Sequence, residues 1–414
     1  MTERAVEEQA PPPGGVRSPV GGGRLPRTLV PAMLAAVAYV DPGNFGVNVS
    51  AGASHGYLLV WVVVFASGSA MVIQYLAAKL GMATGRSLAE HSAARFPGVG
   101  RLLLWAQAEL VVVMTDLAEI VGGAIALRLL FGMPLLGGAV LVTLFSLAVL
   151  ALRVRGRSRF ESVVLVLLGV IIAALLWQAV TGPVDRVGLL RSLVPRPLDS
   201  SAALLAVGIV GATVMPHALH FHSAAARIGE AARTCRDGRM TAPATARSVV
   251  LAMTVAGVAN VSIVVFAAGL PREAGASIES AWVALDAARG QAAATVFAVA
   301  LLASGLAATL VGVQTGDVVM QGFGRRGVPV LVRRSLAVVP VLVVLALGVE
   351  PTSALVWSQV ALSFALPGTL APLLLFTASR RVMGPLVNHP VTTAAAAAIS
   401  LVITALCVFL VVTG

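Results

Sequence analysis

The amino-acid sequence predicts an all-α polytopic membrane protein with eleven transmembrane helices, of which the first and the sixth are broken in mid-span. The prediction rests on the composition, the spacing of the apolar segments and the positions of two prolines. Of the 414 residues, 58% are apolar and only 11% are charged, and the mean hydropathy is +0.93. Such a composition is typical of multi-span membrane proteins and excludes an ordinary soluble enzyme.

The cysteine content and the charge exclude further classes of protein. Cys235 and Cys407 are too few for a disulfide framework or a cysteine metal cage. The formal charge of +11 does not indicate nucleic acid, because the basic residues are spread along the chain. We therefore expect a lipid bilayer around the protein, no nucleic-acid partner and no obligate protein partner.

The chain divides into a short tail and one transporter domain. Residues 1–26 contain three consecutive prolines and a run of three glycines and lack a signal-peptide core, so we expect a disordered cytoplasmic tail. Residues 27–414 form the membrane domain. Its apolar segments lie at about 27–54, 56–82, 101–127, 136–152, 160–182, 202–226, 246–270, 290–320, 335–349, 354–378 and 391–413.

Basic residues predict the orientation of these segments. With the N-terminus in the cytoplasm, the tail and the inside loops hold 23 of the 29 Lys and Arg residues. This asymmetry predicts an N-in, C-out topology. Because the two broken segments are five helices apart, residues 27–182 and 202–378 are expected to form inverted repeats, with 391–413 appended.

The first break lies at Asp41-Pro42-Gly43-Asn44. A carboxylate deep in a span costs about 2.5–3.5 kcal/mol on insertion scales, and Pro42 has no N–H to donate. The helix should break here and free the carbonyls of residues 38–41, which lipid cannot satisfy. The break must therefore face protein, water or an ion. The alternative is a simple proline kink with a buried polar residue.

The second break lies at Met215-Pro216-His217. Paired discontinuous helices in the two halves of a chain are the best sequence indication of a transporter binding site. Together the breaks offer a carboxylate, a carboxamide and a thioether, which indicates a cation site with one soft ligand. The thioether favours a transition metal over Mg²⁺ or Ca²⁺, unless Met215 only fills space in the core.

Ionisable groups in the third span and at the second break predict a proton route. Glu109, Asp116 and Glu119 share one stripe of the third span, and acids on one face of a span usually mark an ion or proton path. His217 can accept a proton near neutral pH. The alternative for the acids is structural pairing, for example with Arg333 or Arg334. His220 and His222 are interpreted as packing residues.

These motifs resemble the Nramp family of divalent-metal transporters, and the resemblance covers about residues 25–390. Besides the two breaks, it includes Ala51-Gly52-Ala53 with Gly56-Tyr57, Ala78-Lys79-Leu80-Gly81, Thr115-Asp116-Leu117-Ala118-Glu119, Gly211-Ala212-Thr213, Val319-Met320-Gln321-Gly322-Phe323, Ser358-Gln359 and Arg380-Arg381-Val382-Met383-Gly384. It implies a LeuT-like fold and proton-coupled uptake of Mn²⁺ or Fe²⁺ across the bacterial cytoplasmic membrane.

The resemblance also implies roles for single residues. Asp41, Asn44 and Met215 match side-chain metal ligands, the carbonyls of Ala38 and Ala212 match backbone ligands, and Gln359 is a candidate contact from the tenth span. His217 and the three acids match a path toward the cytoplasm. Arg334 matches an arginine that pairs with this path, although it can equally be a positive-inside anchor.

The chain also departs from the family pattern. Leu306-Ala307-Ala308 replaces a Gln-Ser-Ser run, Ala365 replaces a glutamine and Ala218 an asparagine, while Asp317 is an additional acid without an assigned role. These changes remove hydrogen-bonding groups around the path but leave the three side-chain ligands intact. We expect no enzyme activity and no cofactor. Two alternatives to a metal importer remain: the same fold carrying Mg²⁺ or a Na⁺-coupled organic solute, and a non-transporting scaffold or sensor.

Overall fold

The computed structural model describes residues 33, 36–155, 157–182, 184–227, 242–324 and 330–413. Within these ranges every regular element is helical and no strand occurs, which confirms the all-α prediction. The expected tail at residues 1–26 lies outside the described residues, as does most of the first half of the first span.

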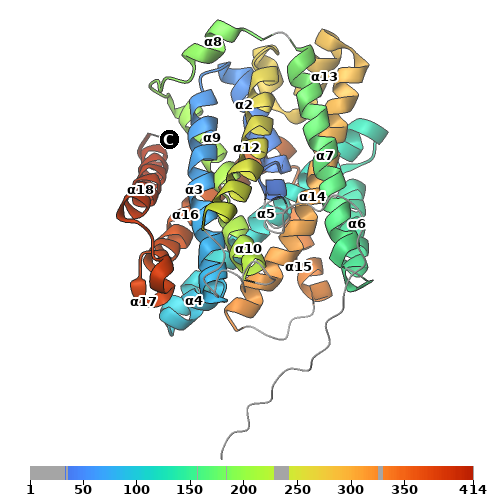
Figure 1. Ribbon diagram of the computed structural model, residues 1–414. Coiled ribbons are helices and arrows are strands. Elements are labelled where there is room, and N and C mark those ends of the chain that lie inside the picture. The colour runs from blue at the N-terminus through green and yellow to red at the C-terminus, as the bar shows by residue number, and fades with distance from the viewer. Residues whose placement is uncertain are drawn as a thin grey trace, which may run out of the picture.

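The long helices correspond to the predicted apolar segments (Figure 1). In chain order they are α2 (Pro42–His55), α3 (Val60–Thr84), α5 (Val99–Phe131), α6 (Leu135–Arg155), α7 (Arg157–Thr181), α9 (Ser200–Val214), α10 (Pro216–Ala226), α12 (Ala242–Ala267), α14 (Gln291–Gly322), α15 (Val330–Ala346), α16 (Pro351–Thr377) and α18 (Pro390–Thr413).

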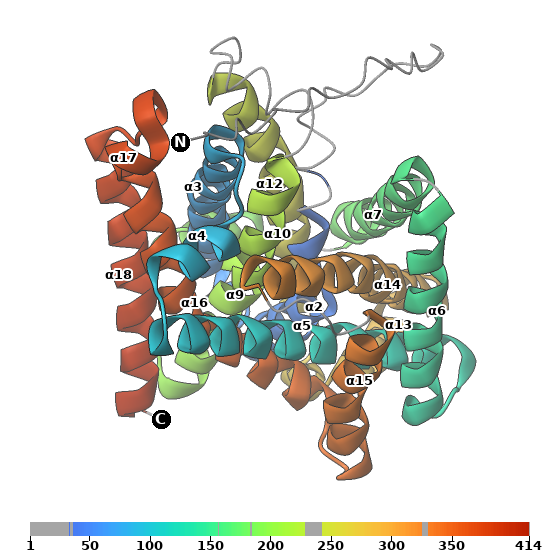
Figure 2. The ribbon, with the colours of Figure 1, turned by 90° about the horizontal axis from the view of Figure 1, so that it is seen from below.

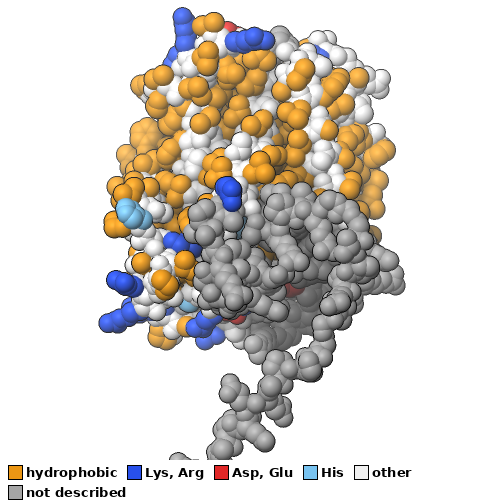
Figure 3. Space-filling model, viewed as in Figure 1, with side chains coloured by type: hydrophobic (Ala, Val, Ile, Leu, Met, Phe, Trp, Pro, Cys, Tyr) orange, Lys and Arg blue, Asp and Glu red, His pale blue; other side chains and the backbone are white. Residues whose placement is uncertain are grey.

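Among the described residues, eight helical stretches are long and apolar enough to cross a membrane, counting α9 and α10 as one. The described part of α6 contributes a shorter apolar helix, Leu135–Val149. The count of eleven spans and their orientation remain predictions. Figure 3 shows apolar side chains over the middle of one face, with most of the visible Lys and Arg near its two ends, as expected for a protein in a bilayer.

Short helices lie between the spans, and hydropathy did not predict them. They are α4 (Leu88–Arg95), α8 (Arg186–Arg191), η1 (Arg272–Ala276), α13 (Ile278–Arg289), α17 (Arg380–Met383) and η2 (Gly384–Leu386). The first of them, α4, begins with a capping box in which Ser87 and Glu90 satisfy each other's backbone N–H groups. These helices are too short to cross a bilayer.

The broken helices lie in the middle of the molecule. In Figure 2, α2, α9 and α10 occupy the centre, with α6 and α7 at one side and α18 at the other. Twelve of the fourteen residues of α2 are buried, whereas only 17% of the apolar window of α18 is buried. The helices that carry the breaks are therefore enclosed by other helices, and α18 is left to face lipid.

Candidate metal site

At the first break, Asp41 is the N-cap of the helix that follows, α2. Residues 36–38 are helical, a turn follows, and α2 begins at Pro42. Asp41 has an extended backbone (φ −82°, ψ 169°), and its Oδ1 accepts the backbone N–H of Asn44 at 2.8 Å. An aspartate N-cap followed by proline at the first helical position is a favoured helix start. The same carboxylate that is costly in a span therefore starts the second half of the helix.

The two prolines free two particular carbonyls. In a continuous helix, the N–H of residue 42 would bond the carbonyl of Ala38, and the N–H of residue 216 would bond that of Ala212. Neither proline has an N–H. At the second break Met215 is the only residue between α9 and α10, and the oxygen of Ala212 accepts Nδ2 of Asn44 at 2.9 Å. The two prolines therefore explain why the carbonyl oxygens of Ala38 and Ala212, both named from the sequence, lack a helical N–H donor.

Other carbonyls at the first break are satisfied by side chains from distant helices. Asn260 of α12 donates through Nδ2 to the oxygen of Tyr39 at 2.8 Å. Ser304 of α14 donates through Oγ to the oxygen of Val40 at 2.6 Å. Sequence reasoning missed both residues, although an asparagine and a serine inside apolar spans were an available signal. The break is therefore held open by the surrounding bundle.

Two oxygen atoms at the first break have no hydrogen-bond partner. They are Oδ2 of Asp41 and Oδ1 of Asn44, on residues that are 1% and 0% exposed. Buried polar atoms of this kind normally have partners, because leaving one unpaired costs roughly 1–3 kcal/mol, and more for a charged group. A carboxylate oxygen and an amide oxygen left together suit a cation that would complete their coordination.

Gln359 of α16 adds a third oxygen of this type. A Cβ on Gly43 would overlap the side-chain amide of Gln359, so that amide packs directly on the turn between Asp41 and Asn44. Its Oε1 is buried and has no hydrogen-bond partner. A Cβ on Gly211 would overlap the backbone oxygen of Gln359. Glycines on both broken helices thus let α16 come close to the two breaks.

Met215 is 0% exposed and belongs to the same buried cluster as Ala38 and Val40. The residues available to an ion here are mostly neutral. Within the described ranges, no three His, Cys, Asp or Glu side chains gather as a metal cluster. An ion at the breaks would be held by one carboxylate together with neutral oxygen and sulfur atoms.

The predicted proton route begins next to the breaks. A Cβ on Gly122 of α5 would overlap the ring of Pro42, so the first break packs on α5 one turn from Glu119. Nδ1 of His217 lies 3.1 Å from Oγ1 of Thr115, the residue before Asp116. His217, Asp116 and Glu119 are all buried. The structure thus brings the histidine of the second break into contact with α5 at the residue before Asp116.

The remaining residues named from the sequence have no contact with the two breaks among the interactions described above. Glu109 is half-buried, seven residues before Asp116 on α5. The backbone of Arg334 belongs to α15, but its side chain lies outside the described residues. His220 and His222 are buried, and Nδ1 of each has no hydrogen-bond partner.

A closed layer separates the breaks from one end of the molecule. A Cβ on Gly46 of α2 would lie 3.0 Å from Cβ of Leu355 in α16, and one on Gly208 of α9 would lie 3.2 Å from Val47 of α2. Real Cβ atoms rarely approach so closely, so α2, α9 and α16 are packed tightly at this level. An ion could reach the breaks from that end only if these helices move.

Two broken helices that meet inside an all-α membrane bundle are typical of multi-pass transporters. The family model for natural resistance-associated macrophage protein-like proteins (Nramp) matches residues 32–413. The chain belongs to the Nramp family. This membership confirms the resemblance, the LeuT-like fold and the location in the cell membrane.

Curated relatives and solved structures agree with this assignment. The chain is 44% identical to the divalent metal cation transporter MntH of Yersinia pestis (strain Pestoides F) over 368 residues, which are 87% of this chain and 89% of the relative. It is 39% identical to MntH of Bacillus subtilis (strain 168), covering 100% of this chain and 99% of the relative. The Eremococcus coleocola manganese transporter is structurally similar, with a TM-score of 0.81 and 30% identity, over 92% of this chain and 85% of that one.

Proposed function

We propose that this protein imports Mn²⁺ or Fe²⁺ together with protons across the bacterial cytoplasmic membrane by alternating access. Membership of a family of metal-ion transporters supports the substrate class. The observation that carries the proposal is the pair of unpaired buried oxygens, Oδ2 of Asp41 and Oδ1 of Asn44, at the junction of the two breaks. The metal ion and the protons are cargo, and no cofactor is required.

The ligand set supports a transition metal over Mg²⁺. Asp41 would supply the one negative charge, while Asn44 and the carbonyls of Ala38 and Ala212 would supply neutral oxygens. Met215 would add a thioether, which binds transition metals better than hard Mg²⁺ or Ca²⁺. Mg²⁺ also gives up its water shell reluctantly, and Asp41, Asn44 and Met215 are all essentially inaccessible to water.

We propose that metal binding is coupled to proton transfer from Asp41 to residues that pack near the breaks. A divalent ion favours the charged form of the Asp41 carboxylate, so a proton held there leaves when the ion binds. The interior has few groups that can accept a proton. We assign the role of acceptor to His217, which contacts Thr115, and to the buried acids Asp116 and Glu119 on the same stretch of α5.

Uptake into proteoliposomes tests the proposal. We expect purified protein to admit Mn²⁺, read by an internal metal-quenched dye, and to acidify the lumen, read by an internal pH dye. Asp41→Ala should abolish both signals. Asp286→Asn is the matched control, because it removes an exposed carboxylate on α13, far along the chain from both breaks. Mn²⁺ entry without lumenal acidification would overturn the coupling, and no entry by the wild-type protein would overturn transport.

A further inference from the structure

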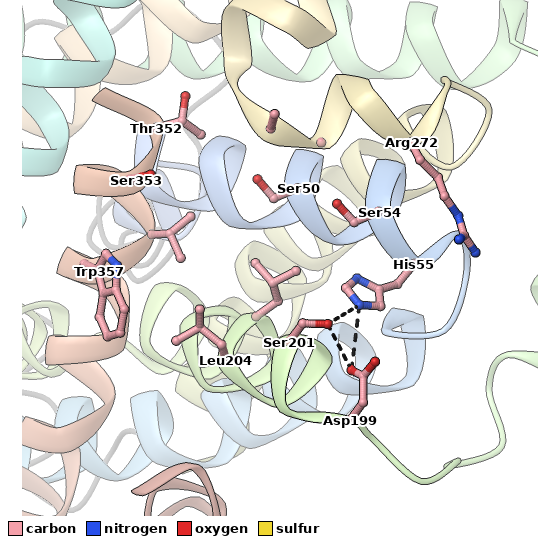
Figure 4. Close-up of a pocket in the computed structure, with 14 residues that line it drawn as sticks. Ser50, Ser54, His55, Asp199, Ser201, Leu204, Arg272, Thr352, Ser353 and Trp357 are labelled. Atoms are coloured by element: carbon pink, nitrogen blue, oxygen red, sulfur yellow. Dashed lines mark hydrogen bonds and ion pairs between the residues drawn. The ribbon is translucent and has the colours of Figure 1, made fainter. Parts of the chain in front are cut away.

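A pocket of 570 Å³ lies beyond the closed layer, at the end of the bundle where α2 ends and α9 begins. Its lining comes from α2, α9, η1 and α16 (Figure 4). The N-in topology predicted from the basic residues would put this end of the bundle outside the cell. Along α2 and α9 the pocket leads toward Asn44 and Ala212, with Val47 and Gly208 between.

Three potential ligand atoms meet at one wall of this pocket. Nε2 of His55, at the end of α2, lies 3.0 Å from Oγ of Ser201 and 3.9 Å from Oδ1 of Asp199. Oγ of Ser201 lies 3.1 Å from the same Oδ1. Figure 4 shows the three side chains turned toward one another. They come from two helices, and 144 residues separate His55 from Asp199 in the chain.

These separations suit one bound metal ion. Imidazole nitrogen and carboxylate oxygen atoms bind transition metals at about 2.0–2.2 Å, so adjacent ligand atoms lie roughly 3 to 4 Å apart. Imidazole is also a ligand that selects transition metals over Mg²⁺ and Ca²⁺. Oγ of Ser201 donates its one hydrogen to Asp199, so Nε2 of His55 donates to Ser201 in this arrangement. Binding of a metal ion at Nε2 needs the other tautomer, with the hydrogen on Nδ1, which is buried and has no hydrogen-bond partner.

We propose that His55, Asp199 and Ser201 form a capture site that binds a divalent transition-metal ion before it reaches the breaks. This inference rests on the proposed import function and deepens it, because it assigns an initial binding site for the ion outside the closed layer. The ion is the cargo, and water would complete its coordination in the open pocket.

The position of Asp199 is fixed by the start of α9. As the N-cap it accepts the backbone N–H of Ala202 at 2.8 Å and the hydroxyl of Ser201 at 3.1 Å. Its side chain is 72% exposed and that of His55 is 14% exposed, so the pair is reachable from the pocket.

The site is built to bind weakly. It has two strong ligands and one hydroxyl, and Arg272 of η1 lines the same pocket. In Figure 4 the Arg272 side chain ends beside His55 and does not lie between His55 and Asp199, so its positive charge opposes a cation without blocking the ligands. A transport pathway needs binding that is strong enough to attract the ion and weak enough to release it.

Metal binding without transport gives the first test. In an Asp41→Ala background the central site is disabled, and Co²⁺ titration should still show one weak site by its visible absorption. Adding His55→Ala should abolish that site. Adding His389→Ala, which removes an exposed histidine outside the pocket, should leave it intact. Co²⁺ absorption that survives His55→Ala would overturn the capture site.

Uptake kinetics give the second test, with two variants whose apparent KM values for Mn²⁺ should change in opposite directions. Asp199→Asn keeps the N-cap acceptor and removes the charge, so the apparent KM for Mn²⁺ should rise roughly three- to tenfold. Arg272→Ala should lower the apparent KM. Unchanged KM in both variants would show that His55–Asp199 only ties α2 to α9.

The two tests separate this inference from the import function. If the wild-type protein carries no metal but the weak Co²⁺ site in the Asp41→Ala background depends on His55, import is wrong and the binding site stands. If transport is normal but that Co²⁺ site is missing, import stands and the capture site is wrong.

Discussion

Nδ2 of Asn44 lies 2.9 Å from the carbonyl oxygen of Ala212 and joins the two helix breaks across 168 residues of sequence. The same nitrogen lies 2.9 Å from Oδ1 of Asp41 and 3.2 Å from the oxygen of Tyr39. Three acceptors around one atom fix the orientation of the amide, because an oxygen there would be repelled by all three. Oδ1 of Asn44 is thereby turned to the other side, where it has no partner.

Substitution of Asp41 should separate its structural role from its charge. Asp41→Asn keeps an N-cap acceptor for the N–H of residue 44, whereas Asp41→Ala loses it at a cost of about 1 kcal/mol. We expect both variants to lose Mn²⁺ uptake and only Asp41→Ala to lose thermal stability in detergent. Near wild-type uptake by Asp41→Asn would show that the carboxylate charge is not needed for the metal.

Replacing Met215 should change selectivity more than folding. Met215→Leu keeps the volume of this buried side chain and removes only the sulfur, while Met215→Ala also leaves a cavity. Cd²⁺ should compete less well for Mn²⁺ uptake in both variants, and Ca²⁺ or Mg²⁺ should compete better, because the soft ligand is gone. An unchanged ranking of competing ions in Met215→Leu would reduce Met215 to a packing residue.

The helix breaks could be predicted from sequence because proline acts locally. Pro42 and Pro216 each remove one hydrogen bond four residues back, whatever the rest of the chain does. The groups that satisfy the neighbouring carbonyls could not be predicted in this way. Asn260 and Ser304 lie 221 and 264 residues from their acceptors, and only the packing of α12 and α14 brings them there.

The short helices show a second limit of sequence reasoning. Hydropathy identifies spans by length, so it predicts loops where α4 and α13 lie. The capping box of Ser87 and Glu90 was a local signal for α4 that hydropathy alone does not use. The His55–Asp199 pair had no such signal, because its two residues meet only through the packing of α2 on α9.

Gly122 should be one of the least tolerant positions on α5. A Cβ there would overlap Pro42, so Gly122→Ala must push the first break away from α5. We expect a loss of at least about 1–3 kcal/mol, the usual cost of overpacking, and loss of uptake. Gly68→Ala on α3 is the control, since nothing lies within 4 Å of its added Cβ. Gly68→Ala should be neutral or slightly stabilising. Equal thermal stability of the two variants would contradict the close packing of Gly122 on Pro42.

Glu90 should make stability depend on acid pH. Its carboxylate pairs with Arg227 at 2.6 Å and accepts the N–H of Ser87 at 2.7 Å. Burial alone would raise the pKa of Glu90, but these partners outweigh it and lower the pKa below its usual value. The ionised group therefore stabilises the fold above about pH 4.3, and this contribution is lost as the pH falls through the lowered pKa.

Glu90→Gln tests this linkage, because glutamine preserves the capping box and removes the charge. Since both side chains of the pair are partly exposed, we expect the variant to be less stable by only about 0.2–1 kcal/mol at pH 7. The difference in melting temperature between wild type and variant should shrink below pH ~4. A difference that stays constant down to pH 3 would mean that the ion pair does not contribute.

The proton route is tested by Asp116→Asn, which keeps the shape of this buried side chain and removes its titrating group. His217 contacts Thr115, the residue before Asp116, which places Asp116 next to the histidine in the proposed route. We expect the variant to retain Mn²⁺ binding but to acidify the liposome lumen less per metal ion than wild type. Glu109→Gln is the control, since Glu109 lies seven residues from Asp116 and is only half-buried; its substitution should reduce acidification less. If Asp116→Asn acidifies the lumen as fast per metal ion as wild type, protons take another route and the stripe on α5 is structural.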